Sequence, residues 1–308
     1  MGGQRTEPLI VSVVLNWNNF EDTAECLNSL AEIEYKNHEV LVVDNHSTDD
    51  SPERIRDKFP WIHFHRTDHN GGYAYGNNAG IEEALDLGAA YVFVLNNDTT
   101  IAPNTVGNLV AVLEDEDEAG IAAPMIYYYD QPNMIQACGS GIDVWKANTR
   151  ARGHLEQDTG QFDERTRVEH ANGAAMMIDR AVFDKIGLFD EDYGYYTEDL
   201  DFSYRATEAG FEIVAVPDAT VRHKVSASTG SQSPFVSYYT VRSKLIFARK
   251  HVGVYQLVPF TLYYAYFVLW RVAGHLLYGH QKTAAAILLG VYHGILGRTD
   301  VYEPITEW

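Results

Sequence analysis

The fold is decided by the run LIVSVVL at residues 9–15, which is short and rich in β-branched residues. The polar cluster NWNN at 16–19 follows directly, so the run predicts a buried strand that ends in a polar loop. Apolar residues at helical spacing follow in 21–33, and 39–43 is a second apolar run that ends at Asp44. Strands that alternate with helices in this way predict a mostly parallel central sheet flanked by helices.

The alternation continues along the first hundred residues. Helices are expected at 51–58, with Pro52 in the first turn, and at 77–87, with strands at 61–66 and 91–95. Ligands bind at the carboxyl ends of the strands in such sheets. Three polar strand ends, at Asn16, Asp44 and Asp98, are therefore expected to line one crevice.

The middle of the chain is less regular. Strands are expected at 174–178 and 213–216, and the segments 127–130 and 144–163 are interpreted as loops. A helix is expected to start beside Glu198 and to end near Gly210.

Composition limits the functional classes. The 308 residues carry 43 acidic and 23 basic side chains, a formal net charge of -20. Nucleic-acid binding is disfavoured because phosphate contacts need clustered cations. The charge is typical of proteins adapted to high salt, although an acidic protein of ordinary habitat remains an alternative. Two cysteines without metal spacing, and no apolar leader in residues 1–8, favour a cytoplasmic location.

The C-terminal part differs in composition. Residues 254–270 carry no charge and are dense in aromatic and aliphatic side chains, and 283–297 is a second apolar stretch. This favours a helix lying on a membrane surface, while a hairpin packed on the rest of the chain and a membrane-spanning helix remain alternatives. Nearby basic residues were expected to assist binding to the membrane surface: Arg242, Lys244, Arg249 and Lys250.

Two aspartates at strand ends suit a nucleotide ligand. The carboxylate of Asp44 can accept from a base N–H or a ribose hydroxyl, although the following residues also suit a turn or helix cap. Asp98 can bind Mg²⁺ or Mn²⁺ together with a diphosphate, although it also suits a loop that begins a helix. The Gly-rich segment 70–78 enters a helix, so its backbone amides are expected to approach the ligand.

A cluster of acids at 198–201 offers a general base. Only one carboxylate is needed to deprotonate a hydroxyl, and helix capping by Thr197 is the structural alternative for the cluster. His223 follows a predicted strand, where it is either a metal or diphosphate ligand or a structural histidine.

Taken together, the motifs resemble the family 2 glycosyltransferases of the GT-A fold, most closely the rhamnosyltransferase-like branch. They occur in family order over about residues 8–225: VVLNWN at 13–18, VVDNHSTD at 42–49, NGG at 70–72 with NNAG at 77–80, LNND at 95–98, GAAM at 173–176 and EDLD at 198–201. Each is weakly specific alone, and the ordered set is strong.

The resemblance implies inverting, metal-dependent transfer of a sugar from a nucleotide-diphosphate donor. Asp199 matches the base, with Glu198 as a supporting acid, and Asp98 matches the metal-binding position, with His223 as a second candidate ligand. The first acid of the family's D-x-D motif is Asn96 here, and Gly76-Asn77-Asn78 replaces the Ala-Arg-Asn of many relatives. The expected contacts to the nucleotide sugar are Asn16, Asn18, Asp44, Asn45, Asn70, Gly72, Asn77, Asn96 and Asn97.

These motifs predict a catalytic domain at 8–225 and a helical, membrane-associating region at 226–308. Transfer of a single sugar to a polyprenyl-linked saccharide, at the cytoplasmic face of the membrane, is the favoured activity, and a soluble or protein acceptor is the alternative. No G-x-G-x-x-G motif follows the first strand, which argues against a dinucleotide oxidoreductase. A nucleotidyltransferase and a non-catalytic nucleotide-sugar-binding module remain alternatives.

Overall fold

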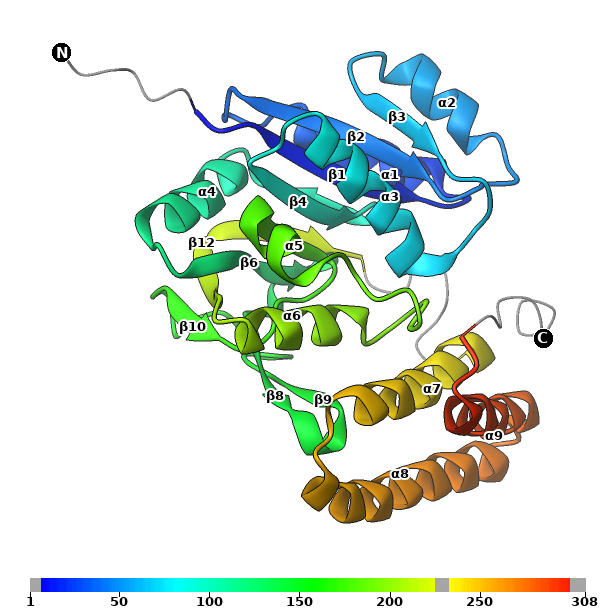
Figure 1. The fold of residues 1–308 in the computed structure, drawn as a ribbon. Coiled ribbons are helices and arrows are strands. Elements are labelled where there is room, and N and C mark those ends of the chain that lie inside the picture. Colours follow the sequence, from blue (N-terminus) through cyan, green and yellow to red (C-terminus); the bar gives the residue numbers. More distant parts are fainter. Residues whose placement is uncertain (1–6, 225–232, 300–308) are drawn as a thin grey trace.

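A computed structural model describes residues 7–224 and 233–299. Within them a large sheet lies between two layers of helices, and three C-terminal helices pack below it (Figure 1). The helices are α1 (Phe20–Leu30), α2 (Ser51–Lys58), α3 (Gly72–Asp86), α4 (Thr105–Asp115), α5 (Arg180–Ile186), α6 (Glu198–Glu208), α7 (Pro234–His251), α8 (Leu257–Leu277) and α9 (Gln281–Leu296). The strands are β1 (Ile10–Asn16), β2 (His38–Asp44), β3 (His63–Arg66), β4 (Tyr91–Asn96), β5 (Thr99–Ile101), β6 (Ala119–Tyr128), β7 (Gln131–Ala137), β8 (Ser140–Asp143), β9 (Asn148–Ala151), β10 (Thr166–Val168), β11 (Ala175–Asp179) and β12 (Glu212–His223).

The sheet order is β10-β12-β6-β11-β4-β1-β2-β3. The half formed by β4, β1, β2 and β3 is parallel, as predicted, and β11 runs antiparallel between β4 and β6. The register places Asn16 beside Asp44 and Leu15 beside Asn96. Polar residues from β1, β2 and β4 therefore meet at one edge of the sheet.

Strand β1 is buried on both faces, which explains why its sequence is a continuous apolar run. Ile10 and Val14 pack in the core beneath α1, α2 and α4. Val11 and Val13 point the other way, into the core beneath α3, α5 and α6. The result is a three-layer α/β/α arrangement, which confirms the predicted fold class.

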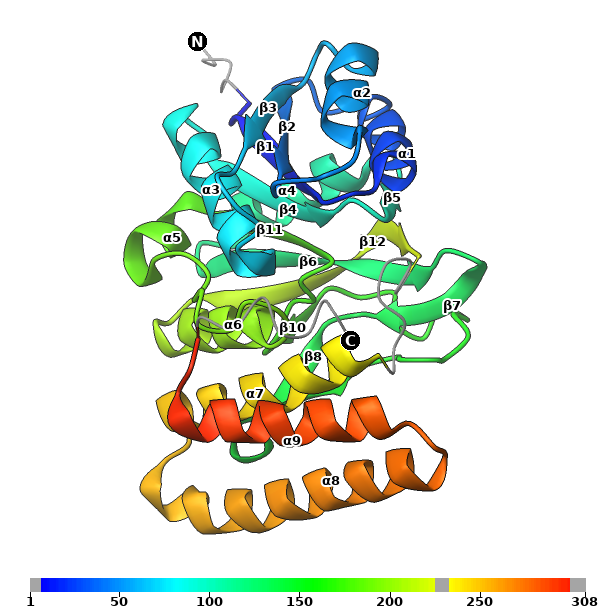
Figure 2. The same cartoon turned by 90° about the vertical axis from the view of Figure 1, so that its right-hand side faces the viewer.

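The C-terminal helices form a separate layer, with α9 packed on α7 and α8 on the outside (Figure 2). Close approach of α9 requires Gly290, since a Cβ there would lie 2.6 Å from the Tyr238 carbonyl oxygen. Pro259 lies in the first turn of α8 and leaves that helix unbroken. No helix in the described ranges combines the length and apolar character needed to cross a bilayer.

The basic residues of α7 do not form the membrane-facing patch that was expected. Arg242 and Lys244 are buried, and their side chains donate to backbone carbonyls elsewhere in the chain. Lys250 pairs with Asp190 and Asp192. The cations of α7 therefore attach this helix to the rest of the molecule, with Arg249 as the exposed exception.

Several boundaries differ from the sequence prediction. Helix α3 begins at Gly72, five residues before the predicted start, and its N-cap residue is Gly71. The Asn70 side chain accepts from the Gly72 amide just before the helix. Strand β9 and the end of β6 lie within segments interpreted as loops, β7 and β8 lie where no element was predicted, and β12 continues to His223. The predicted boundary between 225 and 226 and the first six residues lie outside the described ranges.

Candidate active site

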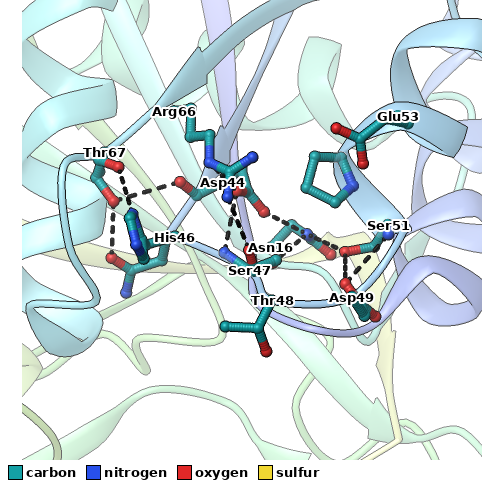
Figure 3. A network of polar contacts seen from close by, with 12 residues as sticks. Asn16, Asp44, His46, Ser47, Thr48, Asp49, Ser51, Glu53, Arg66 and Thr67 are labelled. Atoms are coloured by element: carbon teal, nitrogen blue, oxygen red, sulfur yellow. Dashed lines mark hydrogen bonds and ion pairs between the residues drawn. The ribbon is translucent and has the colours of Figure 1, made fainter.

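A buried polar network joins the ends of β1 and β2 (Figure 3). The Asn16 amide donates to Asp44 Oδ1 at 2.9 Å and to the hydroxyls of Ser47 and Ser51 at 3.2 and 3.1 Å. Asp44 Oδ2 accepts from the Ser47 backbone amide at 3.1 Å and lies 3.4 Å from Arg66 Nε. The Asp44 side chain is fully buried. Its bond from the Ser47 amide stabilises the turn after β2, which is the structural role that the sequence allowed.

A second network connects β2 with the start of α3. The Asn45 amide donates to Asn70 Oδ1 and to the Gly72 carbonyl, both at 2.9 Å. The amides expected to approach a ligand already have acceptors: Gly72 donates to Asn70, and Tyr73 donates to the Gly194 carbonyl at 2.8 Å. The approach of this segment to a ligand stays a prediction, and a ligand contact from either of these two amides would replace a hydrogen bond within the protein.

Three further predicted binding residues, Asn18, Asn97 and Asn77, lie in different parts of the structure. Asn18 accepts from the Thr48 backbone amide at 2.7 Å, beside the first network. Asn97 donates to the Thr23 hydroxyl at 2.9 Å. Asn77 is fully buried, and its Oδ1 has no hydrogen-bond partner within the described residues. Asn77 is thus a buried residue of α3 and does not line the cavity described next.

A cavity of about 370 Å³ gathers the predicted metal and base residues. Its polar walls come from β4, the end of β12 and the start of α6, and aromatic side chains complete it. Five predicted site residues line it together: Asn96, Asp98, Glu198, Asp199 and His223. Residues outside the predicted site set also line it: Trp17, Tyr73, Gln136, Asn172, Gly173, Ala174, Tyr195, Tyr196 and Phe235.

Asp98 and His223 face each other across one wall of the cavity. Asp98 Oδ1 lies 3.0 Å from His223 Nε2, and Gln136 Oε1 lies 3.0 Å from His223 Nδ1. A carboxylate and an imidazole suit Mn²⁺, and a carboxylate suits Mg²⁺. The described ranges contain no cluster of three or more His, Cys, Asp or Glu side chains that could hold a metal ion. Asp98 and His223 are two candidate ligands, and a diphosphate and water would have to supply the others.

Glu198 and Asp199 occupy the first turn of α6 with opposite electrostatic surroundings. Burial, together with the charge of Asp199, raises the pKa of Glu198 well above its usual range. Burial alone would raise the pKa of Asp199, but His170 and the backbone amides of Gly173 and Leu200 outweigh burial and lower it. The surroundings therefore favour the ionised form of Asp199 and disfavour the charged form of Glu198.

Helix capping does not explain the acidic cluster. Thr197 occupies the N-cap position, but its side chain makes no capping hydrogen bond. Asp201 points away from the cavity and bonds to Tyr193, Arg205 and His251. Asp201 thus links α6 to α7, and Asp199 is the member of the cluster that lies ionised at the cavity.

Tyr73 and Gln136 were not predicted as site residues, and each has a structural reason. Tyr73 lies in the first turn of α3, in the Gly-rich segment from which backbone amides, and not this side chain, were expected to contact a ligand. Its hydroxyl donates to the Gly173 carbonyl. Gln136 belongs to β7, which the sequence did not predict. His170 precedes the GAAM motif, and its Nε2 lies 3.3 Å from Asp199 Oδ2. No local sequence pattern predicts this contact.

Comparison with known proteins agrees with this geometry. The family model described as Glycosyl transferase family 2 matches residues 12–187. The low-salt glycan biosynthesis hexosyltransferase Agl10 of Haloferax volcanii is 27% identical over 301 residues, 94% of this chain and 92% of that protein. The N-acetylglucosaminyl-diphospho-decaprenol L-rhamnosyltransferase of Mycobacterium tuberculosis is 30% identical over 210 residues, 62% of this chain and 68% of that protein.

Solved structures share the fold. GalNAc-T7 with UDP, GalNAc and Mn²⁺ superimposes with a TM-score of 0.62 at 16% identity, over 78% of this chain and 48% of that one. The mannosyltransferase PcManGT from Pyrobaculum calidifontis, in complex with GDP-Man and Mn²⁺, gives 0.56 at 18% identity, over 99% and 84%. The fold, the ordered motifs and the family match lead to one assignment. The chain belongs to glycosyl transferase family 2 and is a glycosyltransferase of the GT-A fold.

Proposed function

We propose that this chain transfers a single sugar, with inversion, from a nucleotide-diphosphate sugar to an acceptor hydroxyl, with Asp199 as the base. The observation that carries the proposal is the ionised carboxylate of Asp199 in the same cavity as Asp98 and His223. A carboxylate there takes the hydroxyl proton while the acceptor oxygen attacks the anomeric carbon. Attack opposite the departing nucleoside diphosphate inverts that carbon.

The remaining candidates divide between the nucleotide and the diphosphate. Asn16, Asn18 and Asp44 at the ends of β1 and β2 are proposed to bind the base and ribose, with rearrangement of the enclosed network. Asp98 and His223 are proposed to hold Mg²⁺ or Mn²⁺, which would stabilise the negative charge on the leaving diphosphate. Asn96 stands beside Asp98 at the end of β4 and suits a ribose contact. Contacts from Asn45, Asn70, Gly72, Asn77 and Asn97 remain predictions.

We further propose a polyprenyl-linked saccharide as acceptor, at the cytoplasmic membrane face. The name of the mycobacterial relative specifies a decaprenol-linked acceptor, which supports this class. Helix α8 exposes large apolar side chains, including Leu262 at 69% and Trp270 at 66%, which suits a helix lying at a lipid surface. The net charge of -20 supports work at high ionic strength, where salt screens repulsion.

The test is a donor screen with the full chain. UDP, GDP and dTDP sugars are offered with polyprenyl-diphosphate saccharides, and release of nucleoside diphosphate is measured with Mn²⁺, with Mg²⁺ and with EDTA. One donor should give acceptor-dependent release that EDTA abolishes. Asp98→Ala should weaken donor binding in Mn²⁺ far more than in EDTA, since only the metal-bound form uses this carboxylate.

Two outcomes contradict the proposal. Absence of release from every donor, with acceptors present, counts against the transfer reaction. Release that is equal in EDTA and unaffected by Asp98→Ala counts against the metal site. The product's anomeric configuration, read by NMR, decides between inversion and retention.

A further inference from the structure

His170 is a buried polar side chain that the proposed mechanism leaves without a role. The residue is only 4% exposed, and neither ring nitrogen has a hydrogen-bond partner within the described residues. Leaving a buried donor or acceptor unpaired costs about 1–3 kcal/mol, so such a ring needs an explanation. Its Nε2 lies 3.3 Å from Asp199 Oδ2, at the wall of the cavity.

The backbone around His170 is held firmly at both ends. Its amide and carbonyl exchange hydrogen bonds with Ser140 of β8, at 3.0 and 3.1 Å. The Ala171 amide donates to the Ser203 hydroxyl in α6 at 3.2 Å. The backbone contacts to β8 and α6 therefore place the ring beside the first turn of α6, with Nε2 3.3 Å from the Asp199 carboxylate.

The carboxylate of Asp199 is surrounded by donors. Oδ2 accepts from the Gly173 amide at 2.9 Å and faces His170, while Oδ1 accepts from the Leu200 amide at 2.8 Å. A base whose orientation is fixed by a third group is a recurrent arrangement in catalytic sites. The backbone amides are fixed, so His170 is the part of this donor set that a side-chain substitution can remove.

We propose that His170 is a positioning residue for Asp199: its Nε2–H holds Oδ2 and keeps the carboxylate oriented toward the acceptor hydroxyl. This rests on the proposed role of Asp199 as the base. When Asp199 takes the proton, the O–H bond of the acceptor breaks and the acceptor oxygen forms a bond to the anomeric carbon. The bond between that carbon and the diphosphate oxygen breaks, and the nucleoside diphosphate leaves with its electron pair. His170 makes no bond to the substrate.

The electrostatics around Asp199 support this role. Burial opposes the charge of Asp199, and His170 and the backbone amides of Gly173 and Leu200 act against burial and lower the pKa of Asp199. The His170 ring lowers the pKa of Asp199, so its removal raises that pKa. Because the base must be ionised, the acid limb of the pH–rate profile then moves to higher pH.

The experiment compares His170→Leu with His170→Gln in the full chain, using the donor and acceptor that the wild type accepts. Gln retains an N–H donor, whereas Leu removes it at similar bulk. We expect His170→Leu to lower kcat by about tenfold to a hundredfold, with donor KM within about twofold, and to move the acid limb upward. His170→Gln should recover most of kcat. The proposal is overturned if His170→Leu keeps the kcat and the acid limb of the wild type. It is also overturned if both variants lose donor binding to the same extent.

A second measurement does not depend on finding a donor. The Asp199 carboxyl is followed by ¹³C NMR in protein labelled at aspartate Cγ, and its signal is assigned by its disappearance in Asp199→Asn. The titration midpoint should be higher in His170→Leu than in wild type. An unchanged midpoint overturns the role of His170, whereas a failed donor screen with a shifted midpoint counts only against the proposed reaction.

Discussion

Glu198 and Asp199 are neighbouring carboxyl groups that their surroundings drive in opposite directions. Glu198 is 6% exposed, and its Oε2 has no hydrogen-bond partner within the described residues. Asp199 has backbone donors on both oxygens. Two adjacent acids with separated pKa values are a common way to assign one base in a site. Position in the sequence cannot separate them, because both occupy the first turn of α6.

Amide substitution of each acid tests this division. Asp199→Asn should lower kcat by about 10²- to 10⁴-fold, since it removes the proton acceptor, with donor affinity nearly unchanged. Glu198→Gln should retain much more activity, because the amide resembles the protonated carboxyl. The measurement is kcat together with donor titration for both variants. Near-normal turnover in Asp199→Asn would show that another group is the base.

The same pair predicts a pH dependence of folding stability. The pKa of Glu198 is higher in the folded chain than in the unfolded chain. Its contribution to stability is therefore fully present below the pKa of the unfolded chain and is lost as pH rises through the pKa of the folded chain. Glu198→Gln cannot ionise, so its free energy of unfolding should exceed that of wild type increasingly as pH rises. The lowered pKa of Asp199 acts in the reverse sense, and its stabilising contribution is lost as pH falls. Urea denaturation of Glu198→Gln between about pH 5 and 9, and of Asp199→Asn between about pH 2 and 6, measures these differences, because the contribution of Asp199 changes only near and below the usual aspartate pKa of about 4.

The residue types at the site were readable from the sequence, but their contacts were not. Asp98, Glu198 and Asp199 were placed by ordered motifs, and all three line the cavity. His170 and Gln136 were missed because they reach the site from the middle of the chain, through pairings that no local pattern encodes. Likewise, the Asp44 sequence context suited binding and turn formation equally, and the structure shows the turn bond without excluding the other role.

At the scale of elements, α7 connects the site to the C-terminal layer. Arg242 is 1% exposed and donates to the carbonyls of Asp192, Tyr193, Arg298 and Thr299. The Ser243 hydroxyl donates to the Tyr195 carbonyl. The loop held in this way leads directly into Glu198. Just before it, Tyr196 and Thr197 have φ values of 61° and 80°, a backbone strain typical of functional sites.

Replacement of Arg242 tests this connection. Arg242→Met leaves several carbonyls without their charged donor, so the free energy of unfolding should fall by about 2–4 kcal/mol. Arg249→Met on the same helix is the matched control, because that side chain is exposed, and it should change stability by less than about 0.5 kcal/mol. Urea denaturation measures both. Equal effects of the two substitutions would mean that the buried contacts of Arg242 contribute little net stability.

Elements were predictable where the chain forms the buried parallel half of the sheet, and less so elsewhere. Helix α2 was predicted at its observed bounds, because Pro52 marks its start and the polar face is clear. Strands β7 to β9 were not predicted, since their residues are polar and partly exposed and pair only through distant partners. The basic residues of α7 were expected to support an interfacial helix. The structure instead engages Arg242 and Lys244 with backbone carbonyls and Lys250 with carboxylates.

On the scale of the whole molecule, the acidic surface and the apolar α8 have opposite consequences for a membrane. A net charge of -20 repels anionic lipid, while the exposed apolar side chains of α8 favour the interface. The buried and paired cations of α7 are not available to attract lipid headgroups. Salt screens the repulsion and leaves the apolar contact in place. Binding through α8 should therefore increase with salt, opposite to the trend of a basic patch.

Vesicle flotation of the full chain tests this. We expect binding to vesicles of phosphatidylcholine, and binding to vesicles containing phosphatidylglycerol that rises between about 0.1 and 1 M KCl. Leu262→Glu with Leu269→Glu, seven residues apart on α8, should reduce binding by about tenfold or more, because each leucine contributes about 1.5 kcal/mol on transfer from water. Leu155→Glu is the matched control: this leucine is 62% exposed but lies outside the C-terminal helices, so its replacement should leave flotation unchanged. Binding to anionic vesicles that falls with salt would instead indicate a basic contact, and failure to float under all conditions would remove α8 from the case for a lipid-linked acceptor.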